Sequence, residues 1–366
     1  MKIVVAIDSM KGCLTSWQAA QSARRGILRA CPQALVTTIA ASDGGEGMLE
    51  ACRHATPLHT VPLTVHDPLM RPVTALLGVT PHGDTAIVEM AQASGLTLVA
   101  PHERNPLAAT SLGTGEMIAH ALGMGCRRII VGLGGSATCD CGAGLLQALG
   151  ARFSATGVDL TEFLPHRHPH VEFVAACDVD IPLLGSGGAM HLYSRQKGAT
   201  PAMTTQLEAR ATRFAALAQA ATGRDEAATP GAGAAGGTGF ALRTFCGATM
   251  QRGGDLVLQL ADIDRHLAGA ALAITGEGRA DLQALHGKLP AAVLHHARRH
   301  GVPTALLAGQ VSHEAALLAA GFAAVRCINA PGEPLSRCLE PGVAMRHIER
   351  AAQALACALA FPEKNT

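Results

Sequence analysis

Both ends of this chain repeat one pattern: an apolar run of strand length, then a glycine-rich or acidic turn, then a stretch with helical spacing. The first instance is Lys2–Ile7, which ends at Asp8 and is followed by the helical stretch Ser16–Ala30. Further apolar runs of this kind are Ala34–Ala40, Ala271–Thr275, Thr304–Ala308 and Ala323–Ile328. Such runs, alternating with helices, are typical of parallel strands that are buried on both faces. The pattern therefore predicts an α/β fold built on a doubly wound parallel sheet.

The middle of the chain follows a different pattern. Thr60–Val65, Val73–Val79 and Thr85–Met90 are strand-like runs separated by turn clusters such as His66-Asp67-Pro68, which predicts an antiparallel meander. Since the first pattern occupies both ends, we expect two dissimilar α/β domains. We expect residues 1–60 and 255–366 to form a discontinuous Rossmann-like, doubly wound domain, and residues 61–254 to form an inserted mixed-sheet domain. The active site is expected in the cleft between them.

Composition narrows the class of protein. The 366 residues are enough for two domains. The net charge of +1, with both signs interspersed, argues against a nucleic-acid or anionic-membrane partner. The eleven cysteines include no CxxC pair, and no run approaches the ~18 apolar residues of a spanning helix. We therefore expect a cytoplasmic protein with reduced thiols, and the sequence leaves open whether it forms a homo-oligomer.

Acidic side chains gather at the turns that follow the strand-like runs. They are Asp8, Asp43, Glu46, Asp140, Asp178, Glu277 and Asp281. Ligands of open α/β sheets bind at the carboxyl ends of the strands, and phosphoryl transfer needs carboxylates for Mg²⁺ and an acceptor for the hydroxyl proton. Three lysines beside similar turns, Lys11, Lys197 and Lys288, can hold a phosphate or a carboxylate. This combination predicts a site that handles phosphate.

Two glycine-rich segments offer backbone amides to a phosphate. Gly132, Gly134 and Ala137 follow a strand-like run and match the dinucleotide fingerprint formally, but no acidic strand end follows at the expected distance. A second formal match, which lacks a preceding strand, consists of Gly231, Gly233 and Gly236. The sequence contains no GxxxxGK[ST] P-loop, so a nucleotide would need another cradle. A Rossmann-type NAD oxidoreductase is therefore the weaker alternative to a kinase.

Clusters of histidine are poor metal candidates in this sequence. His166, His168 and His170 lie in a stretch broken by proline, with no cysteine or carboxylate at ligand spacing. His295, His296 and His300 have the spacing of one helix, and we expect them on its exposed face.

A series of motifs extends over most of the chain. In order, they are Asp8-Ser9-Met10-Lys11-Gly12, Asp43-Gly44-Gly45-Glu46-Gly47, Glu89-Met90-Ala91, Gly113-Thr114-Gly115-Glu116, Gly134-Gly135-Ser136-Ala137-Thr138, Cys177-Asp178-Val179, Gln196-Lys197-Gly198-Ala199, Gly233-Ala234-Ala235-Gly236-Gly237, and Thr275-Gly276-Glu277-Gly278-Arg279 with Asp281, His286, Gly287 and Lys288. Together these motifs resemble the type I glycerate kinase family. The resemblance implies two dissimilar α/β domains and an ATP-dependent transfer of phosphate to D-glycerate. The expected acceptor is the 2-hydroxyl group, which gives 2-phosphoglycerate, and the expected cofactors are ATP and Mg²⁺.

The motifs give each candidate residue an expected role. We expect Asp43, Asp178 and Lys11 to be catalytic, with one of the two aspartates orienting or deprotonating the substrate hydroxyl. The substrate-binding candidates are Asp8, Ser9, Ser136 and Lys197. The candidates for nucleotide and phosphate binding are Gly134, Gly135, Gly236, Gly237 and Lys288. The candidate metal ligands are Glu46, Asp140, Glu277 and Asp281.

The chain departs from the family pattern at several places, and two of them bear on activity. Cys139-Asp140-Cys141-Gly142 stands where the pattern usually has Asn-Asp-Gly-Gly, and Asp180-Ile181 replaces two polar residues. These departures motivate a competing hypothesis, a catalytically silent paralogue that binds an acid or a nucleotide.

Overall fold

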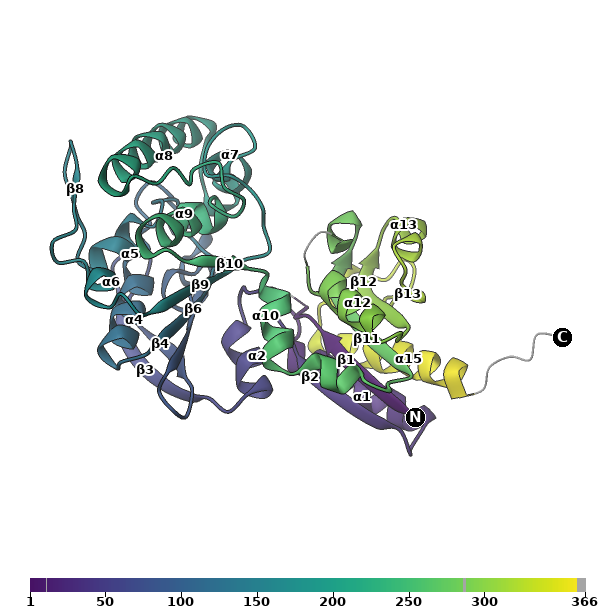
Figure 1. The fold of residues 1–366 in the computed structure, drawn as a ribbon. Helices are drawn as coiled ribbons and strands as arrows, with labels where there is room; N and C mark the ends of the chain where they lie inside the picture. Colours follow the sequence, from purple (N-terminus) through teal and green to yellow (C-terminus); the bar gives the residue numbers. More distant parts are fainter. Residues whose placement is uncertain (11, 286–287, 361–366) are drawn as a thin grey trace. The chain divides into compact units, whose positions relative to one another are not determined.

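The structure is a computed structural model that describes residues 1–10, 12–285 and 288–360 (Figure 1). Lys11, an expected catalytic residue, lies outside the described residues. The chain divides into two compact units. Unit 1 comprises Met1–Asp43, Glu50–Thr56 and Arg252–Thr366, and unit 2 comprises Gly44–Leu49 and Pro57–Gln251. Helix α2 (Met48–Ala55) begins in unit 2 and ends in unit 1.

Unit 1 is built on a five-stranded parallel sheet in the order β13-β12-β11-β1-β2. Its strands are β1 (Lys2–Ile7), β2 (Leu35–Ala40), β11 (Leu272–Ala280), β12 (Thr304–Val311) and β13 (Ala324–Cys327). Within this sheet Val4 of β1 pairs with Thr37 of β2 on one side and with Ala273 of β11 on the other. The chain order therefore reverses between β1 and β11, the place where doubly wound sheets bind ligands. The expected doubly wound sheet is confirmed.

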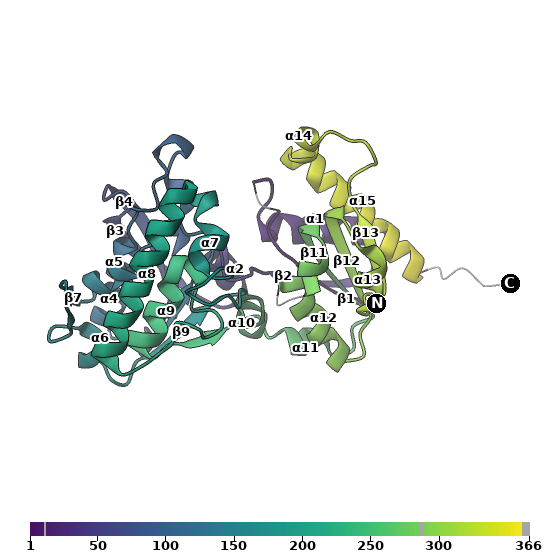
Figure 2. The same cartoon turned by 90° about the horizontal axis from the view of Figure 1, so that it is seen from above.

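The helices of unit 1 cover both faces of this sheet. They are α1 (Ser16–Ala30), α10 (Gly253–Leu260), α11 (Ile263–Leu267), α12 (Leu289–Arg299), α13 (Glu314–Ala319), α14 (Leu335–Cys338) and α15 (Pro341–Ala360), with the 3₁₀ turn η4 (Leu282–Leu285). Helices α1 and α15 lie side by side (Figures 1 and 2), and Ile3 and Val5 of β1 face Ile348 there. Because alternate residues of a strand point to opposite faces, Val4 packs instead with Val293 of α12.

Strand β11 is longer than the sequence pattern predicts. The pattern predicts a turn at Gly276–Arg279, but these residues continue the strand, where Glu277 pairs with Ala308 and Arg279 with Gln310 of β12. The predicted turn is wrong because pairing with β12 satisfies backbone groups that the glycine-rich composition alone would leave in a loop. Glu277 is therefore held by a strand.

Unit 2 is built on a six-stranded mixed sheet in the order β10-β9-β6-β5-β4-β3. Its strands are β3 (His59–His66), β4 (Pro72–Val79), β5 (Thr85–Glu89), β6 (Arg128–Gly132), β9 (Glu172–Ala176) and β10 (Thr249–Gln251). β3, β4 and β5 are antiparallel neighbours, as the meander predicts, whereas β5, β6, β9 and β10 run parallel. A separate hairpin is formed by β7 (Arg152–Phe153) and β8 (Val158–Asp159).

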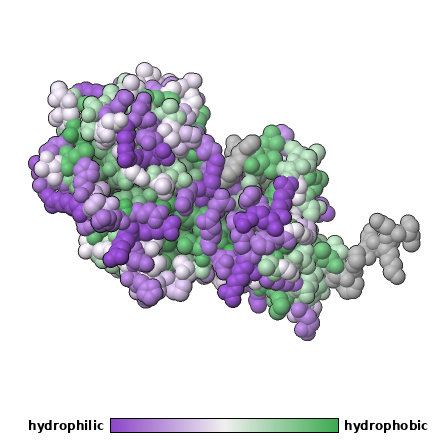
Figure 3. All heavy atoms as spheres, viewed as in Figure 1, coloured by the Kyte–Doolittle hydropathy of each residue, from purple (hydrophilic) through white to green (hydrophobic). Residues whose placement is uncertain are grey.

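The helices of unit 2 enclose a core of its own. They are α3 (Ala91–Ser94), α4 (Leu112–Gly123), α5 (Ala143–Ala148), α6 (Leu164–Arg167), α7 (Ala189–Tyr193), α8 (Pro201–Thr222) and α9 (Ala234–Cys246), with the 3₁₀ turns η1 (Leu96–Leu98), η2 (Pro101–Glu103) and η3 (Arg195–Lys197). Phe240 of α9 is fully buried in this core and contacts Phe214 of α8. On the face in Figure 3, hydrophilic residues are interspersed with hydrophobic ones over each unit.

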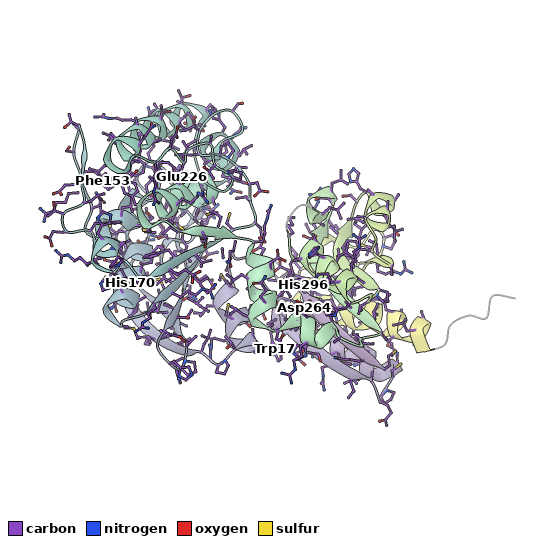
Figure 4. All side chains as sticks on the ribbon, in the orientation of Figure 1. Trp17, Phe153, His170, Glu226, Asp264 and His296 are labelled. Atoms are coloured by element: carbon purple, nitrogen blue, oxygen red, sulfur yellow. The ribbon has the colours of Figure 1, made fainter. Side chains whose placement is uncertain are left out.

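One histidine of α12 is buried, contrary to expectation. His296 donates from Nδ1 to Asp264 Oδ1 of α11 at 3.0 Å, and the two labelled side chains lie next to each other in Figure 4. His300, one turn later, reaches the same oxygen at 2.9 Å. The prediction of an exposed face is wrong for His296 because α11 covers it.

In the described part of the chain, every helix is too short or too polar to cross a membrane.

Candidate active site

Unit 1 contains a cavity of about 360 Å³ at the carboxyl ends of its strands. Four predicted site residues that lie apart in the sequence line it together with Ser9: Asp8 after β1, Asp43 after β2, Glu277 on β11, and Lys288 at the start of α12. The cavity thus lies at the point where the strand order reverses. Its polar side presents carboxylates and an ammonium group to the same space, as a phosphate and metal site requires.

The ends of β1 and β2 are fixed by the start of α1. Thr15 and Gln18 form a capping box in which each side chain bonds the other's backbone amide, at 3.3 and 3.0 Å. The next residue, Ser16, donates its hydroxyl to the Ile7 carbonyl at 2.5 Å and accepts from the Ala41 amide at 2.7 Å. This buried hydroxyl holds the two strand ends that precede Asp8 and Asp43.

Glu277 carries a buried charge that its surroundings only partly balance. The residue is 7% exposed, and its Oε2 lies 3.5 Å from Lys288 Nζ. Burial raises the pKa of the Glu277 carboxyl, Lys288 offsets part of this, and the carboxylates of Asp281 and Asp43 raise it further. Its other oxygen, Oε1, is buried without a hydrogen-bond partner among the described residues. Because an unpartnered buried carboxylate oxygen is costly, this atom fits a bound cation.

The second group of candidate residues lies in unit 2, on the loop after β6. Lys197, which is 3% exposed, donates from Nζ to Ser136 Oγ at 2.9 Å and to the Thr138 carbonyl at 2.8 Å. Burial lowers the pKa of the Lys197 ammonium. No ion pair joins Lys197 to a carboxylate in the described ranges. A buried ammonium group without a carboxylate partner suits an anionic ligand.

Asp140 is fully engaged by its own unit. Its Oδ2 accepts from the backbone amide and hydroxyl of Ser111, both at 2.8 Å, and from the Gly144 amide at 3.1 Å, while Oδ1 accepts from the Gly142 amide at 3.1 Å. These bonds join the starts of α4 and α5. Four donors leave little room for a cation, so the contacts of Asp140 favour a structural role over metal binding.

The glycines predicted to bind phosphate are places of close backbone packing. A side chain at Gly134 would meet Gly45 Cα at 2.3 Å, and one at Gly236 would meet the Thr138 carbonyl oxygen at 2.0 Å. Gly135, Gly236 and Gly237 have φ angles of +76°, +65° and +94°, a region that favours glycine. These glycines let the Gly44–Gly45 loop and the start of α9 pack against the loop after β6.

The remaining candidates are distributed over both units. Asp178 follows β9 in unit 2 and is half-buried, and Glu46 lies in the loop before α2. Asp281 follows β11 in unit 1, where Arg279 Nε lies 3.7 Å from its Oδ2. The described residues include no group of three or more His, Cys, Asp or Glu side chains placed to hold a metal ion by themselves. A metal in the unit 1 cavity would therefore need oxygens from the phosphates or water as well.

One residue with a clear positioning role was not assigned one from the sequence. Glu89 ends β5 and is buried, and its oxygens accept from the amides of Gly47 at 3.0 Å and Leu49 at 2.9 Å. Burial raises the pKa of the Glu89 carboxyl, and the two amides partly offset this. The signal in the sequence is an acidic residue inside the apolar run Thr85–Met90, which a buried strand tolerates only when it is bonded.

The departures from the family pattern at Cys139-Asp140-Cys141 and at Asp180-Ile181 are accommodated within unit 2. Cys139 and Cys141 are buried, and burial raises the pKa of both thiols, well above the ordinary value for Cys141. Cys141 has a φ of +57°, which explains why glycine is usual at this position. Asp180 is exposed, and Ile181 packs against Gly233, whose amide donates to the Ile181 carbonyl at 3.0 Å.

The model of the glycerate kinase family matches residues 3–360. The chain belongs to the glycerate kinase family. It is 39% identical to the glycerate kinase of Bacillus subtilis strain 168, with 98% of each chain covered, and 40% identical to the glycerate 2-kinase of Escherichia coli strain K12, with 86% of each covered. A crystal structure of a protein assigned as glycerate kinase 2 from Salmonella typhimurium LT2 superposes with a TM-score of 0.85 at 38% identity. That alignment covers 100% of this chain and 99% of the other.

Family membership confirms the resemblance inferred from the motifs. It also confirms the expected fold class, because the similar structure covers both α/β units at this identity. The alternative of a Rossmann-type oxidoreductase is not supported: the glycine-rich loop that suggested it follows β6 of the mixed sheet and packs against Gly45.

Proposed function

We propose that this member of the glycerate kinase family transfers the γ-phosphoryl group of ATP to the 2-hydroxyl group of D-glycerate, giving 2-phosphoglycerate and ADP. The observation that carries the proposal is the cavity of unit 1, where Asp8, Asp43, Glu277 and Lys288 converge and one buried oxygen of Glu277 lacks a partner. Family membership supplies the substrate class, since relatives are named glycerate kinase and glycerate 2-kinase.

The residues of unit 1 fit the handling of a metal-bound phosphate. Glu277 would hold Mg²⁺ through its unpartnered oxygen, and Mg²⁺ supplies charge neutralisation on the phosphates when it is bound. Lys288, 3.5 Å from Glu277, would place its ammonium group on a phosphate oxygen. Asp43 would accept the proton of the attacking hydroxyl. Ser9 and Asp8 lie at the same strand end, where the Ser9 amide donates to Asp8 Oδ1 at 2.7 Å.

In unit 2, the buried ammonium group of Lys197 would face the carboxylate of the substrate. Ser136 is held beside it by the 2.9 Å bond and would donate to the same group. Asp178 is the alternative acceptor for the hydroxyl proton, because it follows β9 as Asp43 follows β2. Gly134, Gly135, Gly236 and Gly237 act by keeping this loop closely packed.

The phosphoryl transfer forms one oxygen–phosphorus bond and breaks another, and a proton moves to a carboxylate. The 2-hydroxyl oxygen attacks the γ-phosphorus, the bond from the γ-phosphorus to the bridging oxygen breaks, and ADP leaves with that oxygen. The hydroxyl proton passes to the carboxylate of Asp43 or Asp178. Holding both substrates in line contributes most of the acceleration in such transfers.

The test is product analysis with the purified protein, Mg-ATP and D-glycerate, followed by phosphorus NMR. A resonance of 2-phosphoglycerate supports the proposal, and 3-phosphoglycerate would correct the position of transfer. If no phosphoglycerate forms while ATP or glycerate binds saturably, the protein is the catalytically silent paralogue of the competing hypothesis. Two control reactions run in parallel, one without ATP and one without glycerate. The reaction without glycerate separates phosphoryl transfer from simple hydrolysis of ATP.

A further inference from the structure

The cavity of unit 1 has an apolar side that the proposed chemistry does not use. Met10, Cys13, Ile328, Leu335, Cys338 and Leu339 line it, from the loop after β1, the end of β13, and α14. Leu335 and Leu339 are 56% and 43% exposed, so a ligand in the cavity would gain free energy by covering them.

The size of the cavity is wrong for a small acid alone. Glycerate has three carbons, two hydroxyl groups and a carboxylate, so it presents almost no apolar surface. A cavity of about 360 Å³ with one apolar side is within the range of sites for drug-sized ligands. The base of a nucleotide presents two flat apolar faces, which such a side can bury.

The position of the two sides matches the two ends of a nucleotide. The carboxylates and Lys288 lie at the ends of β1, β2 and β11 and at the start of α12, whereas Ile328, Leu335, Cys338 and Leu339 lie after β13 and around α14. Cys13, in the loop after β1, reaches this second side, because its Sγ lies 4.0 Å from the Cys338 carbonyl oxygen. Strands in a sheet are about 4.8 Å apart, so the cavity extends across several strand ends. Phosphates bound with Mg²⁺ beside Glu277 would therefore leave the base over Ile328 and α14.

One polar group is held in place on the apolar side. Asn329 follows Ile328, donates from Nδ2 to the Gly309 carbonyl at 2.8 Å, and bonds through Oδ1 to Nδ1 of buried His347 at 3.0 Å. Nε2 of His347 lies 3.5 Å from Glu333 Oε2. The amide of Asn329 lines the cavity and keeps a second N–H that is not bonded within the described residues, a donor suited to a ring nitrogen.

We propose that unit 1 alone binds the nucleoside part of ATP, with the base against Met10, Cys13, Ile328 and α14 and with Asn329 donating to the base. His347 is then a positioning residue that fixes the orientation of the Asn329 amide. The inference rests on the proposed kinase function but makes a separate claim, because it assigns the base to this cavity and not to the glycine-rich loops of unit 2.

The thiol of Cys13 lines the cavity, so its rate of alkylation can report whether a ligand is bound there. Site-resolved alkylation of the full chain with N-ethylmaleimide, read by mass spectrometry, measures how fast Cys13 reacts. Saturating adenosine or Mg-ADP should slow this reaction at least about fivefold, and D-glycerate should leave it unchanged. Cys357, exposed on α15 and absent from the cavity lining, is the internal control and should react at one rate throughout.

A substitution tests the same contact by kinetics. Leu335→Ser removes an exposed apolar side chain, so the fold should survive, and it should raise the KM for ATP about three- to tenfold with little change in the KM for D-glycerate. Leu318→Ser is the matched control, because Leu318 of α13 is 42% exposed and does not line the cavity.

The outcomes separate this inference from the proposed function. Protection of Cys13 by glycerate and not by adenosine would overturn the inference and make the cavity the acid site. Phosphoglycerate formation without any protection by ADP would also overturn it, while leaving the kinase function intact. Protection by ADP in a protein that forms no phosphoglycerate would support the site and refute the proposed function.

Discussion

At the scale of single residues, the backbone and the burial of a side chain decide what each position can do. Cys141 adopts a φ of +57° in the core of unit 2, and Glu277 places a carboxylate in a nearly closed setting. Both positions carry a free-energy cost that another residue would remove. Each therefore gives a prediction whose sign follows from local structure.

The protein should be more stable with glycine at position 141 than with alanine there. A left-handed backbone costs an L-residue roughly 1 to 2 kcal/mol, so Cys141→Gly should exceed Cys141→Ala in free energy of unfolding by about 1 kcal/mol. Both variants lose the same thiol, which cancels its packing. Cys139, whose φ is not positive, is the matched control, and there glycine should be less stable than alanine. Urea denaturation of the four variants measures these free energies of unfolding. If the glycine and alanine variants ranked in the same order at positions 141 and 139, the prediction would be contradicted.

Glu277→Gln should stabilise the fold and impair catalysis. The pKa of Glu277 is raised in the folded protein, so the folded state binds the proton more tightly and loses stability relative to the unfolded state as pH rises above about 4.5. Glutamine removes this loss. We expect a higher free energy of unfolding at pH 7, a flatter pH dependence above pH 4.5, and a turnover lower by about a hundredfold.

The control for this substitution is Glu314→Gln, at an exposed position of α13. It should change neither stability nor turnover appreciably. A Glu277→Gln variant that is less stable than wild type at pH 7 would show that the Lys288 interaction outweighs the cost of burying the charge.

At the scale of elements, much of the fold follows from sequence pattern, and the site follows only in part. β1 spans Lys2–Ile7, as its apolar run predicts, because burial on both faces leaves a continuous signal. β11 does not end at Thr275, since pairing with β12 carries Gly276–Arg279 along. Two of the four hydrogen bonds to Asp140 come from Ser111, which is distant in sequence. No local pattern announces such a bond, so its role could not be predicted.

Glu89 links two elements, and its removal should loosen the start of α2. Glu89→Ala leaves the half-buried amide of Gly47 and the buried amide of Leu49 without their acceptor, at a cost of about 2 to 3 kcal/mol. Glu89→Gln keeps one acceptor oxygen but sets its NH2 group against the other backbone amide, so it should retain only part of the stability. Amide hydrogen exchange should rise at residues 44–49 in Glu89→Ala and less in Glu89→Gln. Unchanged exchange in both variants would refute the link.

At the scale of the whole molecule, the chain has separate cores. The core of unit 2 gathers around its mixed sheet and α9, and those of unit 1 lie on the faces of the parallel sheet. The sequence predicts domain boundaries after residues 60 and 254, and the contact units change after Thr56 and Gln251. The sequence does not indicate that Gly44–Leu49 belong to unit 2, because the boundary between Leu49 and Glu50 falls inside the continuous helix α2.

Separate cores predict separate responses to damage. Phe240→Ala should destabilise unit 2 by about 3 to 5 kcal/mol, because Phe240 is 1% exposed in its core. Amide exchange should rise in β6 and β9 while β1 and β11 stay protected. Ile274→Ala, in the parallel sheet, should do the reverse. If either variant raised exchange equally in both units, the molecule would unfold as a single cooperative body.

The position of β1 also governs the order in which a ribosome can complete this protein. β1 lies between β2 and β11, so once it is synthesised it waits for a partner that begins at Leu272. At about 5 to 20 residues per second, the wait lasts on the order of tens of seconds. Pro57–Gln251, by contrast, contains every strand of its own sheet. Unit 1 is therefore completed after unit 2, and until then β1 and β2 are an apolar pair in need of protection.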